Sequence, residues 1–341
     1  MNFLFILLII LNLFLILRLK NISKLINLFD QPDNNLKIHK SKTPLLGGTF
    51  FIINLIFFIT YKFLFDETIN YQKFITREYF SIFFFITSFF VLGLIDDKYK
   101  LRPEKKIVFS ILFSLISLNL NNNLIITNLQ FSFYENTLYL NDFSYFFTIF
   151  CIVILINAIN FYDGINGQSI IFFIFCFSYL AIKSQHQIIY LFIIIVLFFI
   201  LYPNLLGKIF MGDSGIYLLG SILTISLIYE YNKFEKFTYA DEIFLILIIP
   251  GYDLLRLSVT RIINGKNALY GDRNHIQHLL INKFSVIKSN IILFFLICMP
   301  ICLFNFLSIN FFLVLTLITI IYIVLVINLN DKKKYNNRGK K

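Results

Sequence analysis

The sequence predicts an all-α polytopic membrane protein with about eleven transmembrane helices. Of its 341 residues, 58% are hydrophobic and only 14% are charged, and the mean hydropathy is +0.78. Apolar runs long enough to cross a bilayer as a helix recur along the chain. A soluble domain of this size does not have such a composition. We expect one integral-membrane domain over residues 1–330 and a basic tail over 331–341.

Each expected helix is an apolar run that ends at polar or basic residues. The first run has no basic residue before it and no small-residue cleavage site after it, so we expect an uncleaved helix rather than a signal peptide. The expected spans are 2–17, 45–65, 79–95, 107–118, 143–159, 169–183, 187–202, 214–229, 242–259, 289–307 and 309–329.

Basic residues divide unequally between alternate loops. Segments 18–44, 96–106, 203–213, 256–288 and the tail hold 24 of the 30 lysines and arginines. The other loops hold Lys62, Lys73, Arg77, Lys183, Lys233 and Lys236. Cytoplasmic loops are the ones enriched in Lys and Arg, so we expect the N-terminus outside and the C-terminus in the cytoplasm. The net charge of +11 is then explained by contact with membrane lipid, and nucleic acid is not expected as a partner.

The longest expected outer loop, 119–142, contains short β-prone stretches at 124–127 and 138–140 around polar turn residues. We expect a small external β-hairpin at 124–140.

The four cysteines lie inside apolar runs without neighbouring His or carboxylate residues, which favours buried small side chains over metal ligands or a disulfide.

The stretch 157–167 interrupts two apolar runs with closely spaced polar residues. Asn157, Asn160 and Asp163 recur every three residues, which places them on one face if the helix continues. Polar residues at the end of a membrane helix usually face a cavity, although a helix end that reaches the headgroups would look the same.

Four further clusters fall on the same predicted side. They are 40–48 (Lys-Ser-Lys-Thr-Pro-Leu-Leu-Gly-Gly), the Asp96-Asp97 pair, 210–215 (Phe-Met-Gly-Asp-Ser-Gly) and 272–278 (Asp-Arg-Asn-His-Ile-Gln-His). Each cluster could instead have a purely structural role, as a salt-bridged helix end, a glycine turn or a surface histidine pair. Together, oxygen ligands without thiols suit a hard cation such as Mg²⁺, with Mn²⁺ as the alternative, and the Lys and Arg residues suit phosphates.

The order Thr-Pro-x-x-Gly-Gly, Asp-Asp, Asn-x-x-Asn-x-x-Asp-Gly-x-x-Gly, Gly-Asp-x-Gly and Asp-Arg-Asn-His-Ile-x-His over residues 40–280 resembles the polyprenyl-phosphate N-acetylhexosamine-1-phosphate transferases. These share a superfamily with phospho-N-acetylmuramoyl-pentapeptide transferase. The resemblance implies a Mg²⁺-dependent enzyme in the plasma membrane that faces the cytoplasm. It would transfer an N-acetylhexosamine 1-phosphate, GlcNAc 1-phosphate or that of a related N-acetyl amino sugar, from its UDP-sugar to a polyprenyl phosphate, namely undecaprenyl phosphate. UMP is released, and the product initiates a cell-surface glycan such as O-antigen.

The resemblance also implies roles for individual residues. Asp213 would bind the metal, with Asp97 and Asp163 beside it, and Asp96, Asp97, Asp163, His275 and His278 form the catalytic set. The expected substrate-binding residues are Lys42, Thr43, Lys100, Asn157, Asn160, Asn166, Arg261 and Lys266. Which aspartate acts as the general base is left open, as is a homodimeric assembly.

Two positions depart from the family pattern. Asn166 and Gln277 stand where family members commonly have Asp and His, so we expect altered sugar or uracil contacts. The muramoyl-pentapeptide transferase is the alternative within the superfamily. A cation-coupled transporter is an alternative of another class, which would place its aspartates near the middle of the membrane. A non-enzymatic scaffold has no need for five polar clusters on one side.

Overall fold

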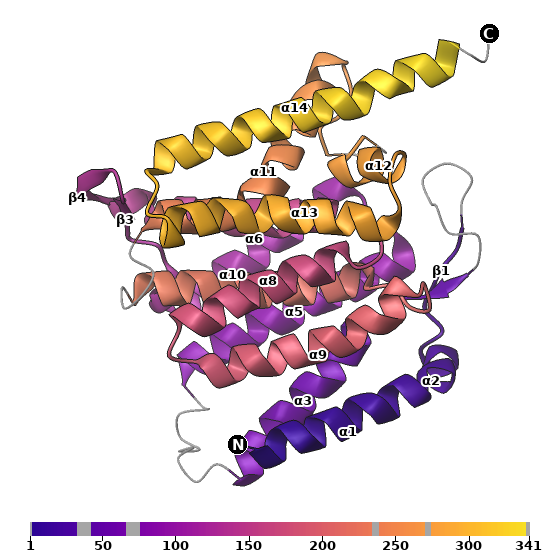
Figure 1. Cartoon of the computed structure of the whole chain (residues 1–341). Coiled ribbons are helices and arrows are strands. Elements are labelled where there is room, and N and C mark those ends of the chain that lie inside the picture. The colour runs from indigo at the N-terminus through magenta and orange to yellow at the C-terminus, as the bar shows by residue number, and fades with distance from the viewer. Residues whose placement is uncertain (1, 33–41, 66–75, 234–238, 270–273, 339–341) are drawn as a thin grey trace.

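The computed structural model describes residues 2–32, 42–65, 76–233, 239–269 and 274–338, with side chains described as far as residue 330. Long helices run across the molecule and pack side by side (Figure 1). The N-terminal end of α1 and the β3–β4 hairpin lie at one end of these helices, and β1 and α12 lie at the other (Figure 1).

The helices follow the apolar runs of the sequence. Their bounds are α1 Asn2–Leu17, α2 Leu19–Ile26, α3 Gly47–Phe65, α5 Arg77–Tyr99, α6 Pro103–Leu120, α7 Ser144–Tyr162, α8 Gln168–Lys183, α9 Gln187–Leu205, α10 Gly212–Asn232, α11 Ala240–Ile263, α12 Ile276–Ile281, α13 Val286–Ile301 and α14 Phe311–Arg338. Short helical turns occupy η1 Asn122–Leu124, η2 Asn141–Phe143 and η3 Cys302–Phe306. Every predicted span therefore coincides with a helix, which confirms the all-α polytopic fold.

By helix length and composition, the structure has fewer candidate membrane spans than the predicted eleven. In the described part of the chain, eight helices are long and apolar enough to cross a membrane, and the bent pair α1–α2 makes a ninth. Helix α8 has only 16 residues. The first turn of helix α6 contains Glu104, Lys105 and Lys106, so its apolar part is short. These two helices account for the difference from the prediction.

Two small antiparallel sheets accompany the helices. Strands β1 (Phe29–Asp30) and β2 (Thr43–Pro44) pair at one end of the molecule. At the other end β3 (Asn128–Phe131) pairs with β4 (Tyr134–Tyr139), which confirms a hairpin but corrects its first strand, predicted at 124–127. The residues Leu124 and Ile125 are instead buried, at 2% and 7% exposure, because they pack into the core.

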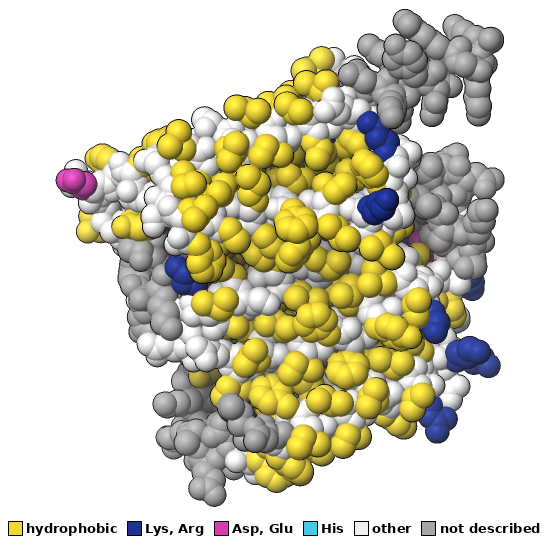
Figure 2. Space-filling model, viewed as in Figure 1, with side chains coloured by type: hydrophobic (Ala, Val, Ile, Leu, Met, Phe, Trp, Pro, Cys, Tyr) yellow, Lys and Arg dark blue, Asp and Glu magenta, His cyan; other side chains and the backbone are white. Residues whose placement is uncertain are grey.

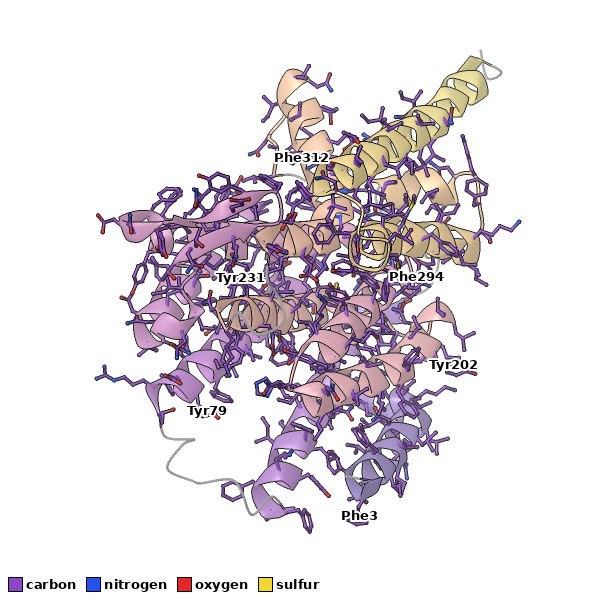
Figure 3. The ribbon with its side chains drawn as sticks, turned by 60° about the vertical axis from the view of Figure 1, so that its left-hand side comes forward. Phe3, Tyr79, Tyr202, Tyr231, Phe294 and Phe312 are labelled. Atoms are coloured by element: carbon purple, nitrogen blue, oxygen red, sulfur yellow. The ribbon has the colours of Figure 1, made fainter. Side chains whose placement is uncertain are left out.

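The hairpin is held by the ends of two helices. Tyr231, near the end of α10, lies below the hairpin in Figure 3, and the Gln130 N–H donates to its hydroxyl at 2.9 Å. The Ser132 N–H donates to the Asp241 carboxylate of α11 at 3.1 Å. The hairpin is therefore a fixed part of the fold.

Helix α10 forms the axis of the bundle. Of its apolar stretch 83% is buried, against 28–44% for the other candidate spans in the described residues. It packs against α3, α5, α7 and α8. Because α10 is fully surrounded, the residues at its first turn are held by several neighbours at once, and Asp213 belongs to that turn.

The surface divides as expected for a membrane protein. Hydrophobic side chains cover the band formed by the long helices, and most of the Lys and Arg side chains on the visible face lie along the edge that carries α2 and β1 (Figure 2).

The prediction that the cysteines are buried holds only for Cys176. Cys151 and Cys298 are half-buried and Cys302 is exposed, and all four are free thiols.

Candidate active site

A cavity of about 620 Å³ opens at the end of the bundle that carries β1 and α12. It is built by the β1–β2 pair, the end of α5, the α7–α8 loop, the α9–α10 connection, α12 and the start of α13. Its lining includes seven of the predicted site residues: Thr43, Asp97, Lys100, Asp163, Asn166, Asp213 and His278. Among these seven, Thr43 and His278 are 235 positions apart in the chain, yet both line the same cavity.

Asp97 fixes the start of α10. Its carboxylate accepts hydrogen bonds from the backbone N–H groups of Asp213 at 2.8 Å and Ser214 at 3.0 Å. These N–H groups have no partner inside their own helix, and the helix dipole favours a negative charge at this end. Gly212 precedes them with a φ of +72°, and a Cβ there would lie 2.8 Å from an Asp97 oxygen. Glycine is therefore required for Asp97 to reach the helix.

Glycines also bring the neighbouring helices against this first turn. A Cβ on Gly93 of α5 would lie 2.4 Å from the Ser214 Cα, and one on Gly48 of α3 would lie 2.6 Å from the Gly215 nitrogen. Atoms cannot approach that closely, so backbone contact is possible only without a side chain. The glycines of the sequence clusters thus serve close packing around Asp213.

Asp96 is not part of the cavity lining and pairs with Lys106, a lysine that was predicted only to contribute charge to its loop. The Lys106 ammonium of α6 forms an ion pair with Asp96 and lies 3.8 Å from the Asp213 carboxylate. The Leu101 N–H donates to Asp96 at 2.7 Å. Asp96 is 1% exposed. Lys106 therefore connects two predicted aspartates. In the sequence, the only feature that could have marked Lys106 as a site residue was its position in the first helical turn after Pro103.

Asp163 lies directly after α7, where the chain has left the helix. The Ser169 hydroxyl donates to its carboxylate at 2.6 Å. Burial raises the pKa of the Asp163 carboxyl to about 6, the Ser169 hydrogen bond opposes this, and the charge of Asp97 adds to the rise. Asp163 is thus a carboxyl group that changes protonation state near neutral pH.

The α7–α8 loop that carries Asp163 and Asn166 is held from two sides. The Gly167 N–H donates to the Asn204 side chain at 2.6 Å, and the Asn290 amide donates to the Asn166 carbonyl at 2.7 Å. Asn204 in turn donates to the Ile209 carbonyl at 3.0 Å and lines the cavity. Asn204 was not predicted as a site residue, because one Asn after a helical proline carries no distinctive signal in the sequence.

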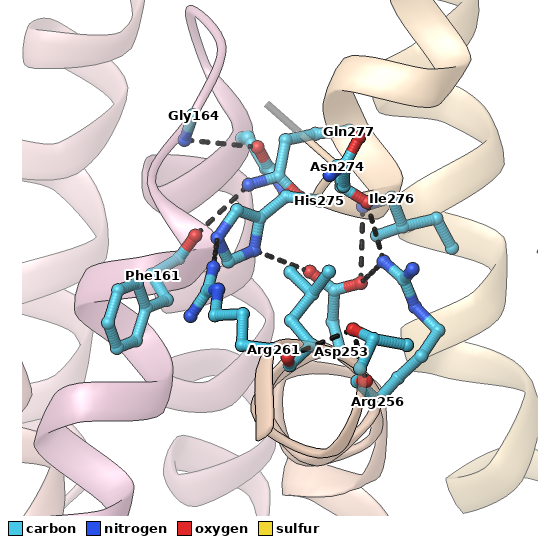
Figure 4. Close-up of polar contacts among 12 residues, drawn as sticks. Phe161, Gly164, Asp253, Arg256, Arg261, Asn274, His275, Ile276 and Gln277 are labelled. Atoms are coloured by element: carbon cyan, nitrogen blue, oxygen red, sulfur yellow. Dashed lines mark hydrogen bonds and ion pairs between the residues drawn. The ribbon is translucent and has the colours of Figure 1, made fainter. Parts of the chain in front are cut away.

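His275 and Arg261 lie in a second network, beside the cavity rather than in its lining (Figure 4). His275 Nδ1 lies 2.7 Å from Asp253, and Arg261 lies 3.4 Å from its other ring nitrogen. The Ile276 N–H donates to Asp253 at 3.1 Å. Arg256 donates both to Asp253 and to the Asn274 carbonyl, each at 2.7 Å.

This network ties the start of α12 to α11. The Gln277 side-chain amide donates to the Phe161 carbonyl at 3.0 Å, so α12 is also tied to the end of α7 (Figure 4). His278, one turn after His275, does line the cavity. The two predicted histidines thus occupy different surroundings: His278 faces the cavity, and His275 is 4% exposed within the network.

The remaining predicted substrate-binding residues lie outside the cavity lining. The Lys42 ammonium lies 4.5 Å from the centre of the Phe29 ring at the rim. The Asn157 amide donates to the Val153 carbonyl of its own helix at 2.7 Å. Asn160 is half-buried on α7, and Lys266 is exposed after α11. Lys40, Asp272 and Arg273 lie outside the described residues.

The carboxylates lie at helix ends and not in the middle of spans. Asp97 is two positions before the last residue of α5, Asp163 follows α7, and Asp213 is the second residue of α10. This placement differs from the midplane sites typical of transporters. No three His, Cys, Asp or Glu side chains within the described ranges are close enough to form a complete metal cage. Mg²⁺ does not need one, because it usually binds one or two carboxylates together with substrate phosphates.

Comparisons with known proteins point to one family. The family model described as glycosyl transferase family 4 matches residues 79–230. A probable undecaprenyl-phosphate N-acetylglucosaminyl 1-phosphate transferase of Bacillus subtilis (strain 168) is 30% identical over 274 residues, which cover 76% of this chain and 72% of the relative. The undecaprenyl-phosphate alpha-N-acetylglucosaminyl 1-phosphate transferase of Escherichia coli (strain K12) is 26% identical over 277 residues, covering 76% and 71%.

A phospho-N-acetylmuramoyl-pentapeptide-transferase of Clostridium botulinum (strain Alaska E43 / Type E3) is also similar. It is 30% identical over 221 residues, which cover 60% of this chain and 65% of the relative. The similarity to the N-acetylglucosaminyl enzymes therefore extends over more of this chain.

Proposed function

The chain belongs to glycosyl transferase family 4, and from this premise we propose that it transfers N-acetylglucosamine 1-phosphate, or a related N-acetylhexosamine 1-phosphate, from its UDP-sugar to undecaprenyl phosphate. An oxygen of the lipid phosphate attacks the β-phosphorus of the UDP-sugar. The bond from this phosphorus to the bridging oxygen of UMP breaks, UMP leaves, and the polyprenyl-diphospho-sugar forms.

The observation that carries the proposal is the convergence of Asp97, Asp163 and Asp213 with Lys100 on one cavity. A nucleotide diphosphate needs positive charge around its pyrophosphate and polar groups for its sugar. Lys100 supplies positive charge, and Thr43, Asn166 and Asn204 supply polar groups. Positioning and charge stabilisation are most of what phosphoryl transfer requires.

Among the three aspartates, Asp213 is the best candidate for a Mg²⁺ ligand. Its side chain is 28% exposed toward the cavity, whereas both oxygens of Asp97 already accept backbone hydrogen bonds. The ion, or Mn²⁺ in its place, supplies neutralisation of pyrophosphate charge when bound. We assign to Asp163 the acceptance of the proton of the lipid phosphate, because a pKa of about 6 suits a base near neutral pH.

The acceptor lipid needs an apolar route to the same charges. A second cavity of about 550 Å³ lies between α5 and α6, and its lining includes Val91, Ile95, Val108 and Phe109. Glu104 and Lys105 border it, directly before Lys106. An apolar cavity with Glu104 and Lys105 at its border is compatible with an isoprenoid chain whose phosphate lies at the polar end.

The cavity lies at the end of the molecule where the basic residues gather. By the positive-inside rule this end faces the cytoplasm, so we place the reaction at the inner leaflet of the plasma membrane. UDP-sugars are then available to the cavity, and the lipid acceptor reaches it from within the bilayer.

The test is direct assay of the purified chain in detergent with undecaprenyl phosphate, Mg²⁺ and a panel of radiolabelled UDP-sugars. We expect UDP-N-acetylglucosamine or a related N-acetylhexosamine donor to yield one labelled lipid and an equal amount of UMP. Labelling only from UDP-N-acetylmuramoyl-pentapeptide would assign the chain to the other branch. No lipid product and no UMP from any donor, with protein that remains folded, would contradict the proposal.

A further inference from the structure

Helix α2 leaves the bundle at a sharp angle. It follows α1 directly, and the two helices are bent by 70° relative to each other. α1 is apolar except for Asn2 and Asn12, whereas α2 has the sequence Leu-Lys-Asn-Ile-Ser-Lys-Leu-Ile. A polar-faced helix that turns this far from a spanning helix runs along the membrane surface.

The two faces of α2 differ in chemistry. Leu19, Ile22 and Ile26 pack against the core on one face. Lys20 and Lys24 are one turn apart on another face, and both are exposed. Leu25 extends the apolar face beyond the protein and is 87% exposed. No residue of α2 is fully buried, so most of this helix contacts whatever surrounds the protein at the headgroup level.

The near end of α2 is fixed to the bundle by α1. Asn12 of α1 and Asn54 of α3 are both fully buried, and each side-chain amide donates to the other side-chain oxygen, at 2.8 and 3.1 Å. Such paired amides within a span hold two helices in one register. The position of α2 is therefore set relative to the rest of the protein.

The far end of α2 leads directly into the rim of the cavity. Asn27 ends the helix in the left-handed conformation, and the Leu45 N–H donates to the Leu28 carbonyl at 3.0 Å. Asp30 then pairs with Thr43, and both line the cavity.

The β1–β2 pair is also hydrogen-bonded to the segment just before Asp213, the proposed metal ligand. The Phe210 N–H donates to the Pro44 carbonyl at 2.9 Å, and the Gly47 N–H donates to the Phe210 carbonyl at 3.0 Å. Phe210 lies three positions before Asp213. A short hydrogen-bonded path therefore connects α2 with Asp213.

We propose that α2 is an anionic-lipid-binding helix, with Leu25 toward the acyl chains and Lys20 and Lys24 on phospholipid phosphates, and that bound lipid holds the β1–β2 edge of the cavity in its active position. Charge complementarity identifies the occupant, because lysines on a surface helix next to a span attract anionic headgroups by up to about fivefold in affinity for each cation. The regulatory half of the proposal rests on the proposed function. The binding half does not.

The absence of tryptophan from the sequence gives a clean probe. Leu25→Trp makes a single-tryptophan protein, which is reconstituted as the full chain in nanodiscs of phosphatidylcholine and phosphatidylglycerol. At equal mole fraction, bromines on the phosphatidylglycerol chains should quench this tryptophan more than bromines on the phosphatidylcholine chains. Lys20→Gln/Lys24→Gln in the same background should abolish that preference. The matched control, Lys62→Gln/Lys233→Gln, removes two cations at the opposite end and should retain it.

Transfer assays complete the test. Phosphatidylglycerol should raise the rate of the wild-type chain several-fold over pure phosphatidylcholine, and Lys20→Gln/Lys24→Gln should lose this gain while matching the wild type in detergent. If the quenching preference survives in the double variant, α2 is not the lipid site. If the preference is lost but the activation remains, α2 binds lipid without controlling the cavity. A chain that transfers no sugar in any lipid contradicts the proposed function, and the quenching result still decides the binding half.

Discussion

The carboxylate of Asp97 accepts a hydrogen bond from the backbone N–H of Asp213 at 2.8 Å. The side chain of one predicted site residue therefore sets the backbone position of another. Asp97 acts on the site by holding the first turn of α10, in addition to the negative charge that it brings to the cavity.

Replacing Asp97 with Ala should therefore affect both stability and activity. Loss of a helix cap costs about 1 kcal/mol, which should lower the Tm of the detergent-solubilised protein. A displacement of about 1 Å at Asp213 is enough to reduce the turnover by about 100-fold. Asp97→Asn keeps one acceptor oxygen and should regain part of the Tm. Normal turnover in Asp97→Ala would contradict this assignment.

Gly93 gives a test of the helix contact itself. A Cβ at this position would lie 2.4 Å from the Ser214 Cα, so Gly93→Ala must push α5 away from α10. Such overpacking costs about 1–3 kcal/mol, and we expect a lower Tm together with reduced transfer. Gly251 of α11 has no atom within 4 Å of its Cβ position, so Gly251→Ala is the matched control and should leave both quantities nearly unchanged.

The acidic limb of the pH profile should report Asp163. Burial raises the pKa of this carboxyl to about 6, so it is protonated below that pH and ionised above it. A proton acceptor must be ionised, and the transfer rate should therefore rise as pH increases through about 6 and level off above it. Asp163→Asn should lose most activity, and its residual rate should lack this limb. A limb of the same midpoint in the variant would assign the titration to another group.

The apolar runs were sufficient to predict the helices, because a span is determined by its own composition. The polar clusters were likewise predicted to converge, and Asp97, Asp163 and Asp213 do line one cavity. Composition was a poorer guide at helix ends. Asp163 was expected to continue the helical face of Asn157 and Asn160, but the chain leaves the helix at Tyr162.

Contacts between distant segments could not be predicted from the sequence. Nothing near Lys106 in the chain indicates that its ammonium reaches Asp96. His275 and His278 were both predicted to be catalytic. In the structure, His275 contacts Asp253 on α11, and of the two histidines only His278 lines the cavity. Tertiary packing alone decides which of two neighbouring histidines meets a substrate.

His275 was predicted to be catalytic, and the network predicts a positioning role that can be distinguished. Its ring bridges Asp253 and Arg261, so His275→Gln leaves a buried carboxylate with one partner fewer and should cost about 1–3 kcal/mol of stability. Activity should fall in parallel with the Tm, through KM as well as kcat. His186 at the opposite end is exposed, and His186→Gln serves as the control. A large loss of kcat at unchanged Tm would instead support direct catalysis by His275.

Asp213 gives the decisive test of the metal assignment. Its carboxylate lines the cavity, and the Lys106 ammonium lies 3.8 Å from it. Replacing it with Asn keeps the size and removes the charge that would hold Mg²⁺. Loss of metal stabilisation is worth several kcal/mol, so transfer should fall by about 100-fold or more while membrane insertion and Tm are retained. Isothermal titration of the wild-type chain with Mg²⁺ and UMP should show metal-dependent nucleotide binding that Asp213→Asn lacks. Asp142→Asn, in η2 at the opposite end of the molecule, removes a charge outside the cavity lining, and this variant should bind and turn over as the wild type does. Full Mg²⁺-dependent activity in Asp213→Asn would move the metal to another carboxylate.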